Sequence, residues 1–194
     1  MNKRDFLAAT AVAGAVLPAM PGHAATPAAG PALLTIGGLV PKGNRPPLHP
    51  ELDQMMVKHG VKFGQAFAFD SAALQKLPKV SIRPTLEYDG KVHTLSGPLL
   101  TSVLAAAGVK ADPALRLGMR AVDGYNVMAS LADITAYRMI LATHLDGQSM
   151  GLGGLGPQWA VYDADRLDAF RSKPLKERFG LCPWGVYYID VAQR

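Results

Sequence analysis

Two Asp-Gly pairs set the strongest limit on how this chain can fold. Asp89-Gly90 interrupts an apolar-rich run over residues 80–95, and Asp123-Gly124 interrupts a second one over 115–129. An Asp-Gly pair between such runs is the strongest short-range pattern for a β-hairpin, because the tight turn needs residues that accept a positive φ. The chain is therefore expected to contain at least two antiparallel strand pairs, and sheets must supply much of its core.

Short apolar runs bounded by glycine or proline predict further strands. These strands are expected at 33–40, 65–69, 138–143, 159–162 and 185–191, with a Pro-rich loop at 41–50 and a helical turn at 165–170. Hydrophobic residues make up 49% of the chain, which is enough for one proper core, and no interior linker is evident. The pattern predicts an α+β fold, β-rich with mixed sheets and short helices, in a single domain over 33–194.

Three short helices are predicted from polar caps that precede apolar residues at helical spacing. The expected N-caps are Asp70-Ser71, Ser96 and Ser130. The helix after Ser96 is the clearest, since Pro98 would occupy its first turn and Gly108 would end it.

The N-terminus predicts export. Residues 1–24 combine Lys3 and Arg4, an apolar run over 6–17 and a small-residue exit, as a secretory signal peptide does. Lys3-Arg4 also approximates the twin-arginine pattern, which leaves both export routes open. Residues 25–32 are rich in Ala and Pro and predict a disordered lead-in. A periplasmic protein is expected.

Charge and composition exclude several partner classes. Loss of the signal, with Lys3, Arg4 and Asp5, lowers the net charge from +5 to +4, and the remaining basic residues are scattered, so nucleic-acid binding is not supported. No apolar run is long enough to span a bilayer, so the protein is not expected to be membrane-embedded. Cys182 is the only cysteine and is expected to be a buried apolar residue, and the histidine spacing gives no metal site.

Two glycine motifs match enzymes only in part. Residues 147–151 fit G-x-S-x-G, but the last histidine, His144, comes before the serine, so no general base follows it. Residues 151–156 fit G-x-G-x-x-G, yet the strand-like run 159–162 follows where a phosphate-binding helix is needed. A hydrolase and a dinucleotide-binding site are both disfavoured, and a glycine-rich loop that leads into a buried strand is the better interpretation.

Five phrases in order resemble the molybdopterin-binding domain of the sulfite oxidase family, above all its small secreted members. They are Phe69-Asp70-x-x-x-Leu74-x-x-Leu77-Pro78, Leu95-Ser96-Gly97-Pro98-Leu99-Leu100-x-x-Val103-Leu104-x-x-x-Gly108, Asp123-Gly124-Tyr125, Gly156-Pro157-x-Trp159-x-Val161-Tyr162 and Trp184-x-Val186-x-x-Ile189-x-Val191. The resemblance covers residues 33–191. It implies the molybdopterin-domain fold.

The chain departs from catalytic members of that family. Those members hold molybdenum through a cysteine thiolate on the strand-loop before the second predicted helix, whereas residues 80–86 contain no cysteine and Cys182 lies far along the chain. The resemblance to the pterin-binding subset implies a sensory protein that binds a free pterin and partners with the periplasmic domain of a membrane signalling enzyme. No catalytic residue and no metal ligand are expected.

The candidate pterin-binding residues are Arg83, Asp123, Tyr125, Trp159 and Trp184. Tryptophan can stack on the heterocycle, a carboxylate can accept hydrogen bonds from the amino-pyrimidine edge, and arginine can donate to its carbonyl. Each also has a structural interpretation, since a strand tryptophan commonly fills the core and an aspartate before glycine commonly forms a turn. Two alternatives stay open, a molybdopterin-dependent oxidoreductase and a partner-binding protein without a small ligand.

Overall fold

The computed structural model describes residues 30–193. The predicted signal peptide, 1–24, and residues 25–29 of the predicted lead-in lie outside the described residues. The chain is tied to the domain from the first described residue, because the backbone N–H of Gly30 donates to Oδ2 of Asp70 at 2.9 Å.

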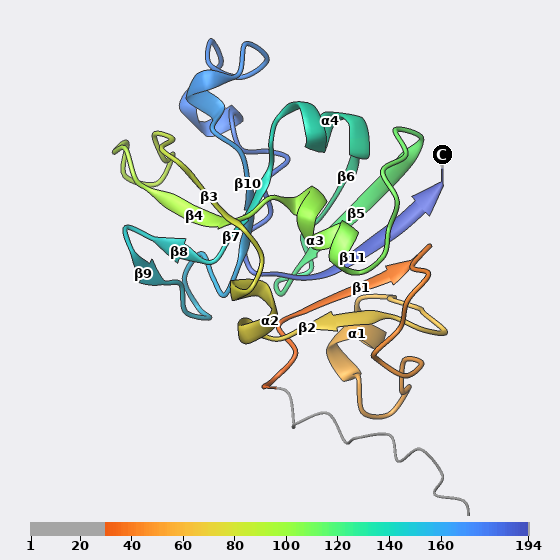
Figure 1. Ribbon diagram of the computed structural model, residues 1–194. Coiled ribbons are helices and arrows are strands. Elements are labelled where there is room, and N and C mark those ends of the chain that lie inside the picture. The colour runs from red at the N-terminus through yellow and green to blue at the C-terminus, as the bar shows by residue number, and fades with distance from the viewer. Residues whose placement is uncertain (1–29, 194) are drawn as a thin grey trace, which may run out of the picture.

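Three sheets form the framework. The largest has the order β2-β1-β11-β5-β6, formed by β1 (Leu34–Gly38), β2 (Phe67–Phe69), β5 (Leu115–Ala121), β6 (Asn126–Ser130) and β11 (Val186–Gln193). Its β1–β11 pair is parallel and its other pairs are antiparallel. The second sheet has the order β3-β4-β8-β9, formed by β3 (Lys79–Ile82), β4 (Leu95–Pro98), β8 (His144–Leu145) and β9 (Gln148–Ser149). The third pairs β7 (Ile140–Ala142) with β10 (Trp159–Val161), between the other two in Figure 1.

The helices are short and lie between the strands. They are α1 (Gln54–Lys58), α2 (Ser71–Gln75), α3 (Leu100–Ala106), α4 (Leu131–Ala136) and the 3-10 turns η1 (Ala164–Arg166) and η2 (Leu175–Glu177). A β-rich α+β fold with mixed sheets is therefore confirmed. Within residues 30–193 no helix combines the length and apolar character needed to cross a membrane.

Two of the predicted helix caps are confirmed, and the third is wrong. Asp70 accepts the backbone N–H of Ala73 at 2.7 Å, and Ser130 accepts that of Asp133 at 3.0 Å. Ser96 instead lies within β4, and α3 begins at Leu100.

Pairing on both sides keeps the segment around Ser96 extended, which explains the missed cap. Strand β4 pairs with β3 and with β8, and a Cβ on Gly97 would overlap the carbonyl oxygen of Leu141. Local capping preference therefore yields to tertiary pairing. The predicted helix end is confirmed, because Gly108 has φ +85° directly after the C-cap residue Ala107.

Both Asp-Gly pairs form turns, but only the second joins two long paired strands. Strands β5 and β6 pair over five residue pairs and enclose Asp123-Gly124, as predicted. Around Asp89-Gly90 the regular pairing is confined to β3 and β4, with one further bridge between Thr85 and Val92. Residues 83–94 thus form a long loop that extends from the sheet.

Candidate functional site

The registry of the largest sheet brings distant segments to one edge. Strand β11 begins beside the end of β5, where Val186 pairs with Ala121. The backbone N–H of Val122 donates to the carbonyl of Gly185 at 3.0 Å, so the β5–β6 loop lies against the residues that precede β11. Tyr125 and Trp184, 59 positions apart in the chain, therefore face the same pocket.

A pocket of about 280 Å³ opens at this edge. The residues that line it include Glu87, Tyr88, Asp123, Tyr125, Lys176 and Trp184. Three of the five predicted binding residues, Asp123, Tyr125 and Trp184, are thus brought together. Glu87, Tyr88 and Lys176 were not predicted, because they come from the long loop and from η2, whose approach to the β5–β6 loop leaves no pattern in the sequence.

The β5–β6 loop holds one carboxylate in place. Asp123 Oδ1 accepts the backbone N–H of Tyr125 at 2.9 Å, and Gly124 between them has φ +92°. The Tyr125 hydroxyl donates to the carbonyl of Gly180 at 3.0 Å, which ties this loop to the segment after η2. Asp123 is therefore both a turn former and an exposed acceptor, since its second carboxylate oxygen accepts no hydrogen bond from residues 30–193.

The two tryptophans have different positions. Trp184 is half-buried and lines the pocket. Trp159 is only 1% exposed and lies in the core, where its indole N–H donates to the carbonyl of Cys182 at 2.8 Å. Its ring lies 6.5 Å from that of Tyr88, measured between ring centroids. Trp159 therefore packs in the core behind the pocket residue Tyr88 and does not line the pocket.

Burial and charge perturb two ionisable groups of the pocket. Burial, followed by the nearby negative charge of Glu87, raises the pKa of Tyr88 above its usual value, so its hydroxyl stays protonated at neutral pH. Burial also raises the pKa of Cys182 to about 12. This thiol is 4% exposed, as expected for a buried apolar residue.

The residues present do not fit the molybdenum site of the resembled family. The only cysteine, Cys182, is buried in the pocket wall shortly before β11, whereas the ligating cysteine of catalytic members lies on the strand-loop before the second predicted helix. Among residues 30–193 no three His, Cys, Asp or Glu side chains gather in a way that could hold a metal ion.

Arg83 lies elsewhere. It lines a larger cleft beside β3, together with residues of η1 and the turn after α4. Its backbone N–H donates to Oδ2 of Asp163 at 3.3 Å. The structure thus separates Arg83 from Asp123 and Trp184, because Pro84 and Thr85 carry the chain away from β3 before Glu87 reaches the pocket.

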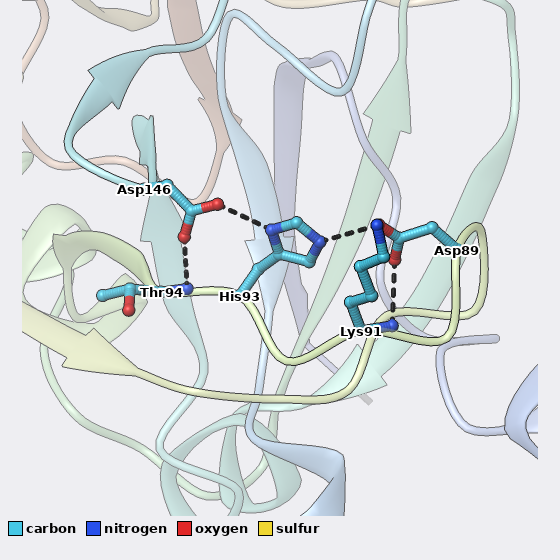
Figure 2. Close-up of polar contacts among 5 residues, drawn as sticks. All are labelled: Asp89, Lys91, His93, Thr94 and Asp146. Atoms are coloured by element: carbon cyan, nitrogen blue, oxygen red, sulfur yellow. Dashed lines mark hydrogen bonds and ion pairs between the residues drawn. The ribbon is translucent and has the colours of Figure 1, made fainter.

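A histidine bridged by two carboxylates fastens the long loop that carries Glu87 and Tyr88. Figure 2 shows His93 between Asp146, 2.7 Å from its Nδ1, and Asp89, 3.0 Å from its Nε2. Asp146 also accepts the backbone N–H of Thr94 at 2.8 Å. Hydrogen bonds to Asp146 and Asp89 raise the pKa of His93, and those from His93 lower the pKa of each carboxyl.

The G-x-S-x-G serine lies in a hairpin and not on a nucleophile elbow. Ser149 belongs to β9 and pairs across the hairpin with His144 of β8. Its hydroxyl oxygen is 3.3 Å from His144 Nε2, so the structure places a histidine beside the serine although that histidine comes earlier in the chain. The serine does not lie on the strand-to-helix turn that holds an esterase nucleophile. The G-x-G-x-x-G run likewise leads into β10, a buried strand, as predicted.

Comparison with known protein families and with characterised proteins gives no match for this chain.

Proposed function

We propose that the protein binds a free pterin in the pocket formed by Asp123, Tyr125 and Trp184. The observation that carries this proposal is the convergence of these three side chains in one pocket of about 280 Å³. That volume suits a small bicyclic ligand, since it lies just below the range of about 300–1,000 Å³ typical of sites for larger small molecules.

The chemistry of the pocket complements a pterin. Trp184 and Tyr88 offer aromatic faces for the flat heterocycle. Asp123 and Glu87 offer carboxylates to the amino and ring N–H groups of the pyrimidine edge, and Lys176 offers a donor to a carbonyl. The two carboxylates and one ammonium leave an excess of acceptors, which favours a ligand with several N–H donors.

The wider proposal is a sensory protein of the periplasm with a sulfite oxidase-like molybdopterin-domain fold. It rests on the resemblance of residues 33–191 and on the export signal predicted in residues 1–24. In that role the loaded protein would bind the periplasmic domain of a membrane signalling enzyme.

Isothermal titration with neopterin tests the pocket directly. Trp184→Ala removes the stacking face, and we expect affinity to fall about 5- to 150-fold, from a stacking contribution of about 1–3 kcal/mol. Asp123→Asn keeps an oxygen for the Tyr125 N–H but removes the charge, so a loss of about 10-fold or more is expected with the fold retained. Asp168→Asn, on the exposed surface, is the matched control and should leave affinity unchanged.

Equal neopterin affinity in all of these variants would refute the proposed pocket. Native mass spectrometry of the protein purified from a pterin-producing host separates the other functions. Excess mass equal to a free pterin supports the proposal, whereas the mass of a molybdenum cofactor would favour the oxidoreductase. No added mass, together with no titratable binding, would favour a partner-binding protein without a small ligand.

A further inference from the structure

A second and larger cleft, of about 780 Å³, lies beside the edge strand β3. Three arginines from separate segments line it: Arg83 directly after β3, Arg138 after α4 and Arg166 in η1. No residue of the pterin pocket lines this cleft.

The three guanidinium groups have no ion-pair partner within residues 30–193. None of the five ion pairs among the described residues involves Arg83, Arg138 or Arg166. The cleft has two carboxylates, but Asp165 is already paired with Arg178 at 2.7 Å and also accepts hydrogen bonds from Thr85. With Asp165 neutralised in this way, the residues that line the cleft carry three positive charges and one negative charge, that of Asp163.

Arg138 occupies a position that favours glycine. It follows the C-cap residue Tyr137 of α4 with φ +50°. The N–H of Arg138 donates to the carbonyl of Thr135, and the N–H of Met139 donates to that of Ile134, the paired bonds of a Schellman motif. An L-residue with a side chain is strained in this conformation, so the presence of arginine here favours a role for its side chain in the cleft.

The remaining walls of the cleft are mostly apolar. Val80 and Ile82 of β3, Val92, Leu167 and the ring of Tyr137 line it. Charged donors above apolar walls complement a molecule with an acidic group on an apolar body, because arginine binds carboxylate and phosphate oxygens through paired N–H groups.

An added peptide strand fits the cleft less well. Strand β3 offers an edge of only four residues, Lys79–Ile82. Pro78 precedes it and Pro84 follows Arg83, so neither end can extend a ladder of backbone hydrogen bonds.

We propose that this cleft is a binding site for a small organic anion, a carboxylate or phosphate ester on an apolar body, held by Arg83, Arg138 and Arg166. The proposal does not depend on pterin binding in the other pocket.

Isothermal titration of the full chain with three matched probes tests the site. The probes are 2-naphthoate, 2-naphthyl phosphate and the neutral 2-naphthamide. We expect at least one anion to bind 10-fold or more tightly than the amide, and the stronger of the two identifies the acidic group. Equal binding of all three, or binding of an acidic six-residue β-strand peptide without binding of either naphthyl anion, would overturn the proposal.

Arg138→Gly is the decisive variant, because it removes the guanidinium while relieving the positive-φ strain. We expect anion affinity to fall 10-fold or more while the melting temperature stays equal or rises. Arg83→Gln should also weaken binding, whereas Arg171→Ala, on the exposed surface and paired with Asp168, should not. Unchanged anion affinity in Arg138→Gly with an intact fold would refute the assignment, since its melting curve separates lost binding from lost folding.

Discussion

Replacing Trp159 by alanine should destabilise the domain rather than act only on ligand binding. The side chain is 1% exposed, and its ring lies 6.0 Å from that of Phe179 and 6.5 Å from that of Tyr88. Truncation of a buried tryptophan costs about 3–5 kcal/mol in lost transfer free energy and cavity formation. The Cys182 carbonyl also loses its indole donor, which adds about 1 kcal/mol.

The expected loss for Trp159→Ala is therefore about 4–6 kcal/mol, a large share of the roughly 5–15 kcal/mol that stabilises a typical domain. Urea unfolding followed by circular dichroism measures it directly. The melting temperature should fall by roughly 10–20 °C for a chain of this size. Trp159→Phe keeps an aromatic ring but loses the N–H donor, and should cost less than the alanine variant.

Trp184→Ala is the matched control, because the same truncation is made at a half-buried position that lines the pocket. Its free energy of unfolding should change far less than that of Trp159→Ala. Equal losses of stability in the two variants, or a loss below about 1 kcal/mol for Trp159→Ala, would refute the distinction between a core tryptophan and a pocket tryptophan.

Two further predictions concern the close packing of Gly97 in β4 and the hydrogen bonds of His93. Gly97→Ala should destabilise by about 1–3 kcal/mol or more, because the new Cβ meets the backbone of Leu141, whereas Gly64→Ala, which has open space, should be near neutral; equal urea midpoints would contradict this. Because the pKa of His93 is raised in the folded state, its stabilising contribution is complete below the unfolded-state pKa of about 6.5. This stabilisation disappears as the pH rises through the folded-state pKa. The pKa values of Asp89 and Asp146 are lowered in the folded state, so the stabilising contribution of these carboxylates is present above about pH 3.9. It is lost as the pH falls through their folded-state pKa values. The melting-temperature difference between wild type and His93→Gln should thus be largest between about pH 4 and 6.5. A difference independent of pH would contradict a stabilising role for the hydrogen bonds of His93 with Asp89 and Asp146.

Elements defined by local chemistry were predictable from the sequence. The Asp123-Gly124 turn, the Ser130 cap and the end of α3 just before Gly108 each depend on neighbours within a few residues. The prediction was wrong at Ser96, where β3 and β8 pair with the segment from both sides. Helix α1 was not predicted, because it follows a proline-rich segment and makes no side-chain cap hydrogen bond.

The candidate site likewise has features that the residue types indicate and features that only tertiary contacts produce. Aspartate, tyrosine and tryptophan could be identified as candidates, since their chemistry is evident in the residue types. Their convergence depends on the β5–β11 register, which joins segments about 60 positions apart. Arg83 was predicted to join these residues but lies in the cleft beside β3, because the two residues after it direct the chain away from β3 toward the smaller pocket.

By itself the sequence determined the β-rich class, the turns and the chemical groups available for binding, because these depend on local conformation and composition. Only the tertiary structure decided that Trp184 faces the pocket while Trp159 fills the core, and that Arg83, Arg138 and Arg166 share a cleft. The physical reason is that strand register and close packing set the positions of these side chains, and both arise from contacts between residues far apart in the chain.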